Sequence, residues 1–187
     1  RCQQALDLAR RHGAGQVEVF GQSTRTITST VEKDDLQISK SRQEMRIGVR
    51  AFVGTQVGFA STNNPDKLED AAKDAVTLAE ASPGDPNNVL PQPGPVEAIP
   101  GTYDPAAEAF TTADAVHQAI RMLEIAKSID KRVIVGDAEF SSEIRDRVLL
   151  NSAGAEARER GSLFAYNVLI TARDGDVVSN MDFKFGA

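Results

Sequence analysis

The sequence contains little cysteine, little histidine and no long apolar segment, and each shortage excludes a class of structure. Its single cysteine, Cys2, cannot form a disulfide within the chain or complete a thiolate metal site, which fits a reducing compartment. No apolar run approaches the ~20 residues that span a bilayer, and no charged start followed by an apolar stretch indicates a signal peptide. We therefore expect a cytoplasmic protein without a membrane partner.

Clusters of positive charge are also missing. The net charge is -6 and the isoelectric point is about 5.0, and no run of lysine or arginine extends beyond a pair. A nucleic-acid-binding surface needs clustered cations to neutralise phosphates. The composition therefore argues against direct nucleic-acid binding, and its 41% hydrophobic and 26% charged residues are typical of an ordinary globular protein.

The two histidines do not form a recognisable metal site. Neither His12 nor His117 lies in the HExxH arrangement that puts two zinc ligands and a general base on one helix. His117 lies one helical turn from Asp114 and Arg121, which is typical of an exposed histidine on a helix face. No G-x-S-x-G nucleophile elbow is present either. The sequence therefore predicts no catalytic residue, no metal site and no cofactor in this chain.

The clearest structural signal is the run RIGVRAFVGTQVGFASTNN at residues 46–64. Apolar residues alternate with other residues over 46–53, the period of two that buries one face of a strand. Residues 54–56 supply a turn and 57–61 return as a second strand, after which Asn64 and Pro65 predict the N-cap and first position of a helix. Gly48 and Gly58 lie inside these strands, which indicates a bulge, the interpretation we favour, or the close approach of another backbone.

Further helices and strands follow on both sides of a proline-rich segment. The patterns predict helices over 3–12 and 65–81 and from Thr112, which we expect to cap its helix. They predict strands over 17–31, 36–47, 133–140 and 147–151, and a last hairpin whose arms, 163–172 and 177–185, meet at Asp174 and Gly175. Seven of the eight prolines lie within residues 83–105, where we expect an extended segment.

We therefore predict an α+β fold of antiparallel sheets with flanking helices. Its expected divisions are a first α+β lobe with a closing helix at 1–81, a proline-rich linker at 82–111 and a second α+β lobe at 112–187. The order helix, strand, strand, hairpin occurs on both sides of the linker. This order suggests the hypothesis that the two lobes repeat one α-β-β-hairpin unit.

Several short motifs, taken in order, resemble those of a known family. They are GAGQVEVF, EKDDLQ, GVR, GFASTN, DKRVIV and VLLNSAG. Their order and spacing over nearly all of the chain resemble the N-terminal half of the TldD/PmbA family, whose members carry the name modulator of DNA gyrase. Since the chain begins at Arg1 without a methionine and ends just after an expected strand, we expect it to be the N-terminal domain of a longer protein.

The resemblance implies a noncatalytic domain that helps assembly and peptide access in a zinc metallopeptidase. It implies that a C-terminal domain, absent here, carries hydrolysis and an HExxxH zinc site. The implied partners are a second copy or a related family member in a dimer, and a peptide or unfolded protein as substrate. One alternative is a metal-free PmbA-type subunit with a regulatory or binding role, and a weaker one is an independent surface-binding module.

Four residues are candidates for a substrate groove or an interface: Arg50, Ser61, Thr62 and Asn63. The Arg50 guanidinium presents a fixed fork of donors that suits a carboxylate or a peptide terminus. The simpler interpretation of Arg50 is a structural salt bridge at the surface or between the lobes. For residues 61–63 the simpler interpretation is capping of the helix that follows.

Overall fold

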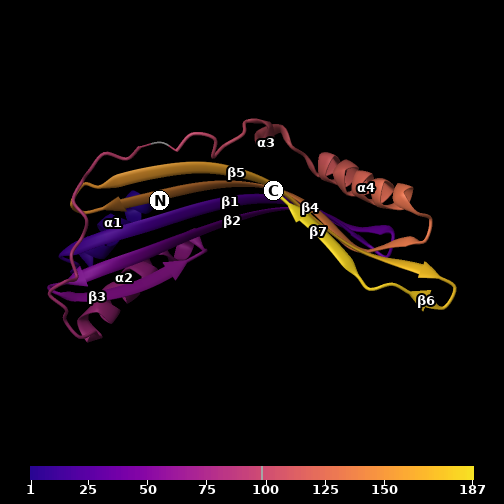
Figure 1. Ribbon diagram of the computed structural model, residues 1–187. Helices are drawn as coiled ribbons and strands as arrows, with labels where there is room; N and C mark the ends of the chain where they lie inside the picture. Colours follow the sequence, from indigo (N-terminus) through magenta and orange to yellow (C-terminus); the bar gives the residue numbers. More distant parts are fainter. Residues whose placement is uncertain (98) are drawn as a thin grey trace. The chain divides into compact units, whose positions relative to one another are not determined.

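The structure is a computed structural model that describes residues 1–97 and 99–187. It consists of long antiparallel strands with flanking helices (Figure 1), which confirms the predicted α+β class. In chain order the elements are α1 (Cys2–Arg11), β1 (Gln16–Glu32), β2 (Asp35–Val53), β3 (Gln56–Thr62), the 3-10 helix η1 (Pro65–Lys67), α2 (Leu68–Ala81), α3 (Ala106–Ala109), α4 (Thr112–Ile129), β4 (Val133–Asn151), β5 (Glu156–Asp174), β6 (Val177–Val178) and β7 (Asp182–Gly186).

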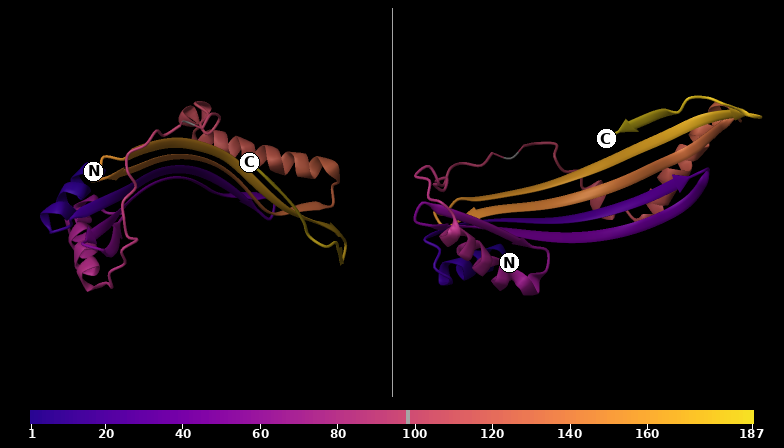
Figure 2. Two further views of the ribbon diagram at one scale, coloured as in Figure 1. Left: turned by 60° about the vertical axis from the view of Figure 1, so that its left-hand side comes forward. Right: turned by 90° about the horizontal axis from the view of Figure 1, so that it is seen from below.

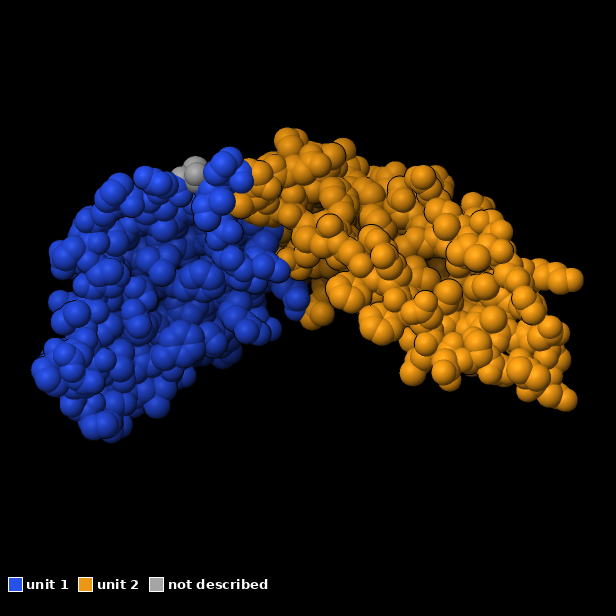
Figure 3. Space-filling model, in the orientation of Figure 1, with its two compact units in different colours: residues 1–23, 44–100, 145–160 blue, residues 24–43, 101–144, 161–187 orange. Residues whose placement is uncertain are grey.

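The chain forms two compact units, each built from three separate segments (Figure 3). Unit 1 comprises residues 1–23, 44–100 and 145–160, and unit 2 comprises residues 24–43, 101–144 and 161–187. The segments alternate because β1, β2, β4 and β5 each contribute one end to each unit. These units cut across the predicted lobes 1–81 and 112–187. The division of the sequence into those lobes and the linker 82–111 stays a prediction.

Unit 1 has a sheet covered on one face by two helices. Its strand order is β3-β2-β1-β4-β5, and α1 and α2 lie beside each other on that sheet (Figure 2). Apolar side chains from both helices and three strands form the core, among them Leu6, Leu8, Val17, Val19, Ile47, Val49, Leu68 and Val76. The period-two alternation of β2 puts Ile47, Val49 and Ala51 into this core, as the sequence predicts.

The β2–β3 hairpin confirms the strand, turn and strand predicted over residues 46–61. The antiparallel register runs unbroken from Ile47 opposite Thr62 to Val53 opposite Gln56. The bulge favoured at Gly48 and Gly58 is therefore wrong. Gly58 instead lies against the backbone of α2, where an added Cβ would come within 2.1 Å of the Ala75 carbonyl oxygen. A glycine is needed at this position because a helix backbone occupies the space of a side chain.

The helix after this hairpin begins where the sequence predicts. The Asn64 side chain accepts a hydrogen bond from the Asp66 amide at 2.9 Å, and Pro65 occupies the first helical position. One 3-10 turn, η1, precedes α2.

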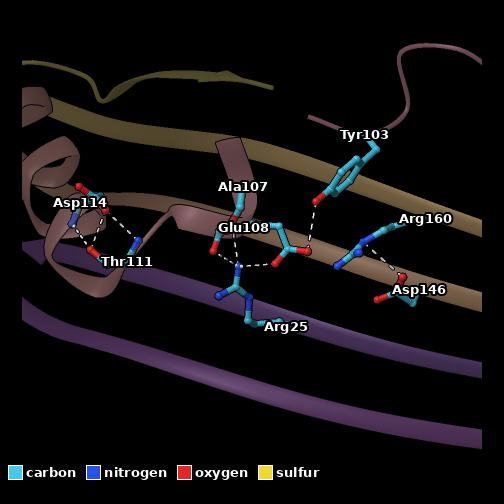
Figure 4. A network of polar contacts seen from close by, with 8 residues as sticks. All are labelled: Arg25, Tyr103, Ala107, Glu108, Thr111, Asp114, Asp146 and Arg160. Atoms are coloured by element: carbon cyan, nitrogen blue, oxygen red, sulfur yellow. Dashed lines mark hydrogen bonds and ion pairs between the residues drawn. The ribbon is translucent and has the colours of Figure 1, made fainter. Parts of the chain in front are cut away.

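The predicted start of the last helix is wrong by one residue. Thr111, and not Thr112, is the N-cap of α4: its hydroxyl accepts from the Asp114 amide at 3.3 Å, and the Asp114 carboxylate accepts from the Thr111 amide at 2.8 Å (Figure 4).

Unit 2 has one long helix on its sheet. Its strands follow the order β2-β1-β4-β5, and both β6 and β7 pair with β5. Helix α4 lies along one face of this sheet (Figures 1 and 2). The buried core consists of Val31, Ala119, Ala126, Val133, Val135 and Ala138. Gly175, with φ of +61°, forms the predicted turn after Asp174.

The β1–β2 turn of unit 2 is held by an aspartate. Lys33 and Asp34 have φ of +52° and +69°, the left-handed conformation that a two-residue hairpin turn requires. The Asp34 carboxylate accepts a hydrogen bond from the Val135 amide at 2.8 Å and forms an ion pair with Lys127 of α4. This one side chain therefore ties the turn to both β4 and α4.

Candidate functional site

Arg50 lies on β2 in unit 1 and is held by two neighbours. Its Nη2 atom lies 2.7 Å from Oε1 of Glu18 on β1, and its guanidinium carbon lies 5.4 Å from the centre of the Phe52 ring. The Arg50 side chain remains 43% exposed, whereas Glu18 is 14% exposed. Arg50 thus forms the structural salt bridge of the simpler interpretation, within unit 1, and still presents part of its guanidinium at the surface.

Phe59 and Ser61 extend this surface onto β3. Phe59 is paired opposite Arg50 and is 59% exposed. Its ring covers Gly48, since a Cβ there would lie 2.9 Å from the ring edge. Ser61 lies opposite Gly48 and is two residues from Phe59, so it belongs to the same sheet face. We call Glu18, Arg50, Phe59 and Ser61, which lie beside the buried Phe52 ring, the Arg50 surface.

Thr62 and Asn63 are not part of the Arg50 surface. Thr62 follows Ser61 directly, so its side chain has the opposite orientation on the strand. The Thr62 hydroxyl accepts from the Asn64 amide at 3.0 Å and donates to the Asn64 carbonyl at 3.1 Å. Asn63 lies between β3 and η1. Thr62 therefore shapes the entry to the helix, while a binding role for these four candidates stays a prediction.

Glu18 and Phe59 are not among the candidates predicted from the sequence. Both carry a signal in the alternation of their strands, because Glu18 lies between the buried Val17 and Val19, which assigns it to the opposite face. Phe59 likewise follows Gly58, whose position faces α2. What the pattern cannot supply is the register between β1 and β2, which decides that Glu18 and Arg50 meet.

The candidate ligands and nucleophiles of the chain are dispersed. In residues 1–97 and 99–187, no three His, Cys, Asp or Glu side chains lie together in a way that would hold a metal ion. His12 ends α1, with Nε2 3.7 Å from Glu69, and His117 is exposed on α4. Burial raises the pKa of the Cys2 thiol, which disfavours the reactive thiolate. None of the described helices is long and apolar enough to cross a membrane.

A polar network in unit 2 fixes the short helix α3 (Figure 4). The Arg25 guanidinium on β1 donates to the carbonyls of Ala107 at 2.7 Å and Glu108 at 3.1 Å. The Tyr103 hydroxyl donates to the Glu108 carboxylate at 3.2 Å. All of these groups have partners within the unit. The network therefore explains how the chain is anchored after the proline-rich segment and does not suggest a ligand site.

Two family models match this chain. Residues 17–79 match domain 1 of the PmbA/TldA metallopeptidases, and residues 105–186 match their central domain. The chain belongs to the PmbA/TldD family. The resemblance inferred from the order of short motifs is thereby confirmed, and the PmbA/TldD matches include both Arg50 and the candidates at 61–63.

Solved structures share the fold. TldE from Thermococcus kodakarensis is 21% identical with a TM-score of 0.87, over 98% of this chain and 42% of that one. A protein named as a proposed modulator of DNA gyrase from Bacteroides thetaiotaomicron is 20% identical with a TM-score of 0.83, over 98% and 43%. A protein similarly named from Thermotoga maritima is 14% identical with a TM-score of 0.79, over 98% and 41%.

This PmbA/TldD chain spans less than half of the length of those structures. At such low identities the likeness shows the fold alone. None of the curated proteins matches the sequence significantly.

Proposed function

We propose that this chain is a noncatalytic N-terminal domain of a TldD/PmbA-like zinc metallopeptidase. In this role it helps assembly and the access of peptide substrates, while a further C-terminal domain carries the zinc and the hydrolysis. The observation that supports the proposal is the match of the chain to domain 1 and the central domain of a metallopeptidase family, combined with the dispersal of potential metal ligands in the described residues.

The Arg50 surface is the part of unit 1 best suited to contact a partner or a peptide. Arginine and aromatic side chains contribute most of the binding energy in protein interfaces, and here Arg50 and the exposed Phe59 lie opposite each other. The ion pair with Glu18 holds the guanidinium in place, so less conformational entropy is lost on binding. The proposed assembly is a dimer, with a second copy or a related family member, in the cytoplasm.

The test begins with the natural polypeptide that contains these residues. Zinc is measured by elemental analysis, and cleavage of an unstructured peptide is followed with and without a chelator. We expect about one zinc per chain and chelator-sensitive cleavage by the longer polypeptide, and no cleavage by residues 1–187. Robust chelator-sensitive cleavage by residues 1–187 alone would contradict the proposal. A longer polypeptide that binds no zinc after supplementation would overturn the peptidase role in favour of the regulatory subunit.

The role of the Arg50 surface is tested by substitution in the same longer polypeptide. Phe59→Ser should weaken dimerisation or raise KM by about tenfold without changing the zinc content, because Phe59 contacts no proposed metal ligand. Leu78→Ser is the matched control, since Leu78 of α2 is 49% exposed and lies outside the Arg50 surface. Equal effects of the two substitutions on sedimentation and on KM would exclude the Arg50 surface from both roles.

A further inference from the structure

Unit 2 contains a groove that the proposed function does not use. Its volume is about 510 Å³, within the range of small-molecule sites. Helix α4, β5 and β7 line it, chiefly with apolar side chains that include Met122, Ile125, Ile129, Val168 and Ile170. Several of these remain in water, with Ile129 73% and Ile125 55% exposed. A bound apolar group would remove this surface from water, which is favourable.

The groove is long. Its lining residues on α4 extend from Gln118 to Ile129, and at the rise of an α-helix this stretch measures about 16 Å. On the sheet it follows β5 from Tyr166 to Ile170, about 13 Å at the rise of a strand. A linear molecule fits these dimensions better than a compact ring system does.

The two ends of the groove differ in polarity. The Arg173 amide donates to the Arg132 carbonyl at 2.9 Å, which puts the C-terminal end of α4 beside the end of β5. Ile129 and Ile170 therefore mark an apolar end. Towards the other end lie the hydrogen-bond donors Gln118, Arg121 and Tyr166, and Lys184 lies midway along the β5 stretch, opposite Val168.

Two cations on the donor side of the groove have no partner among the described residues. Among residues 1–97 and 99–187, neither the Arg121 guanidinium nor the Lys184 ammonium has a hydrogen bond or an ion pair. Lys184 lies opposite Val168 in the β5–β7 register, whereas Asp182 lies opposite Ile170 at the apolar end. A negative charge on a ligand would thus be attracted to one end and repelled from the other, which sets its direction in the groove.

An alkyl chain suits the groove better than a peptide. An extended peptide brings backbone N–H and C=O groups that need hydrogen-bond partners when buried, and apolar side chains form most of the lining. We infer that the groove binds a free long-chain fatty carboxylate, with its chain along α4 and its carboxylate at Arg121 and Lys184. This binding goes beyond the proposed peptidase role and does not depend on it.

The experiment is a calorimetric titration of the chain with dodecanoate below its critical micelle concentration. Dodecyltrimethylammonium, which has the same chain and the opposite charge, is titrated in parallel. We expect saturable binding of one dodecanoate, with a Kd about tenfold below that of the cation. Equal affinity for the two head groups, or binding without saturation, would overturn the inference.

Variants locate the site. The double variant Arg121→Glu, Lys184→Glu should raise the Kd of dodecanoate by about tenfold or more. The matched control Arg11→Glu, Lys73→Glu changes the net charge equally at exposed residues of unit 1 and should leave the Kd within about twofold. Ile125→Glu should weaken both ligands, because Ile125 is 55% exposed and lines the apolar part. Circular dichroism confirms that each variant is folded.

Three results would contradict the location or the ligand. The first is a control double variant that weakens dodecanoate binding as much as the groove variant does, because that outcome would show a general charge effect. The second is an Ile125→Glu variant that binds dodecanoate with an unchanged Kd. Displacement of dodecanoate by an equimolar apolar peptide with an acidic terminus would replace the fatty carboxylate by a polypeptide as the occupant.

Discussion

Units 1 and 2 share the strands β1, β2, β4 and β5 but differ in how completely helices cover the sheet. In unit 1, α1 and α2 pack together over the strands, and alanines of α2 allow its backbone to approach β3 at Gly58. In unit 2, α4 covers the core of the sheet but leaves Ile125 and Ile129 beside an open groove. A second long helix closes the core of unit 1, whereas the only other helix in the described part of unit 2 is the four-residue α3, and the groove beside α4 stays open.

The close approach of α2 to Gly58 in unit 1 offers the largest expected effect. Gly58→Ala puts a Cβ within 2.1 Å of the Ala75 carbonyl oxygen and 2.2 Å of the Ala79 amide nitrogen. Since both neighbours are backbone atoms, α2 must move away from β3, and we expect a loss of about 3 kcal/mol in the free energy of unfolding. Urea denaturation measures it. Gly94→Ala is the control, because nothing lies within 4 Å of that Cβ, and similar losses in the two variants would show that the helix contact is unimportant.

In unit 2 the corresponding test removes the Asp34 side chain. Asp34→Ala leaves the Val135 amide without its acceptor and removes the ion pair with Lys127, so we expect a loss of about 2 kcal/mol. Asp34→Asn retains an acceptor oxygen and tolerates the positive φ, and should lose less than about 1 kcal/mol. Denaturation curves of both variants and of Asp35→Ala, at an exposed neighbour, provide the comparison. Equal losses for alanine and asparagine at residue 34 would rule out the hydrogen bond as the main contribution.

The smallest expected effect is the pH-dependent contribution of the exposed Asp130–Arg132 ion pair of unit 2 to stability. Hydrogen bonds from the Arg132 side chain, and then from its backbone, lower the pKa of Asp130 from 3.8 to about 2. Because the folded-state pKa is the lower one, the pair stabilises the fold above about pH 4 and this contribution is lost as the pH falls through 2. Asp130→Asn should therefore be slightly less stable at neutral pH, with the difference shrinking below pH 4. Unfolding curves at several pH values measure this trend, which Asp176→Asn should not reproduce.

The local features of the fold could be predicted from the sequence, whereas the pairing of distant segments could not. Asn64 with Pro65, the turn at Gly175 and the β2–β3 hairpin depend on neighbouring residues, and each is present. The residue pattern predicts two strands in place of β4 because polar residues obscure the alternation, although Ser142 and Ile144 are buried. A buried serine in a strand does not carry the apolar signal on which such predictions depend.

The candidate sites show the same limit. Arg50 could be selected from its residue type and strand position, but its partner Glu18 comes from β1 and depends on a long-range register. The groove of unit 2 requires α4, β5 and β7 together. Its one local signal is that apolar residues on α4 extend beyond a single stripe to Ile125 and Ile129, which indicates a second apolar flank.

The alternation of segments between the two units has a consequence for synthesis of the chain on the ribosome. Unit 1 begins at residue 1 but is completed only by residues 145–160, and unit 2 begins at residue 24 and is completed by residues 161–187. Contacts between such distant segments slow folding, because a long loop must close before they form. Neither unit can acquire all of its strands until most of the chain has been translated. The edge of β1 that pairs with β4 therefore remains unpaired until β4 has been synthesised.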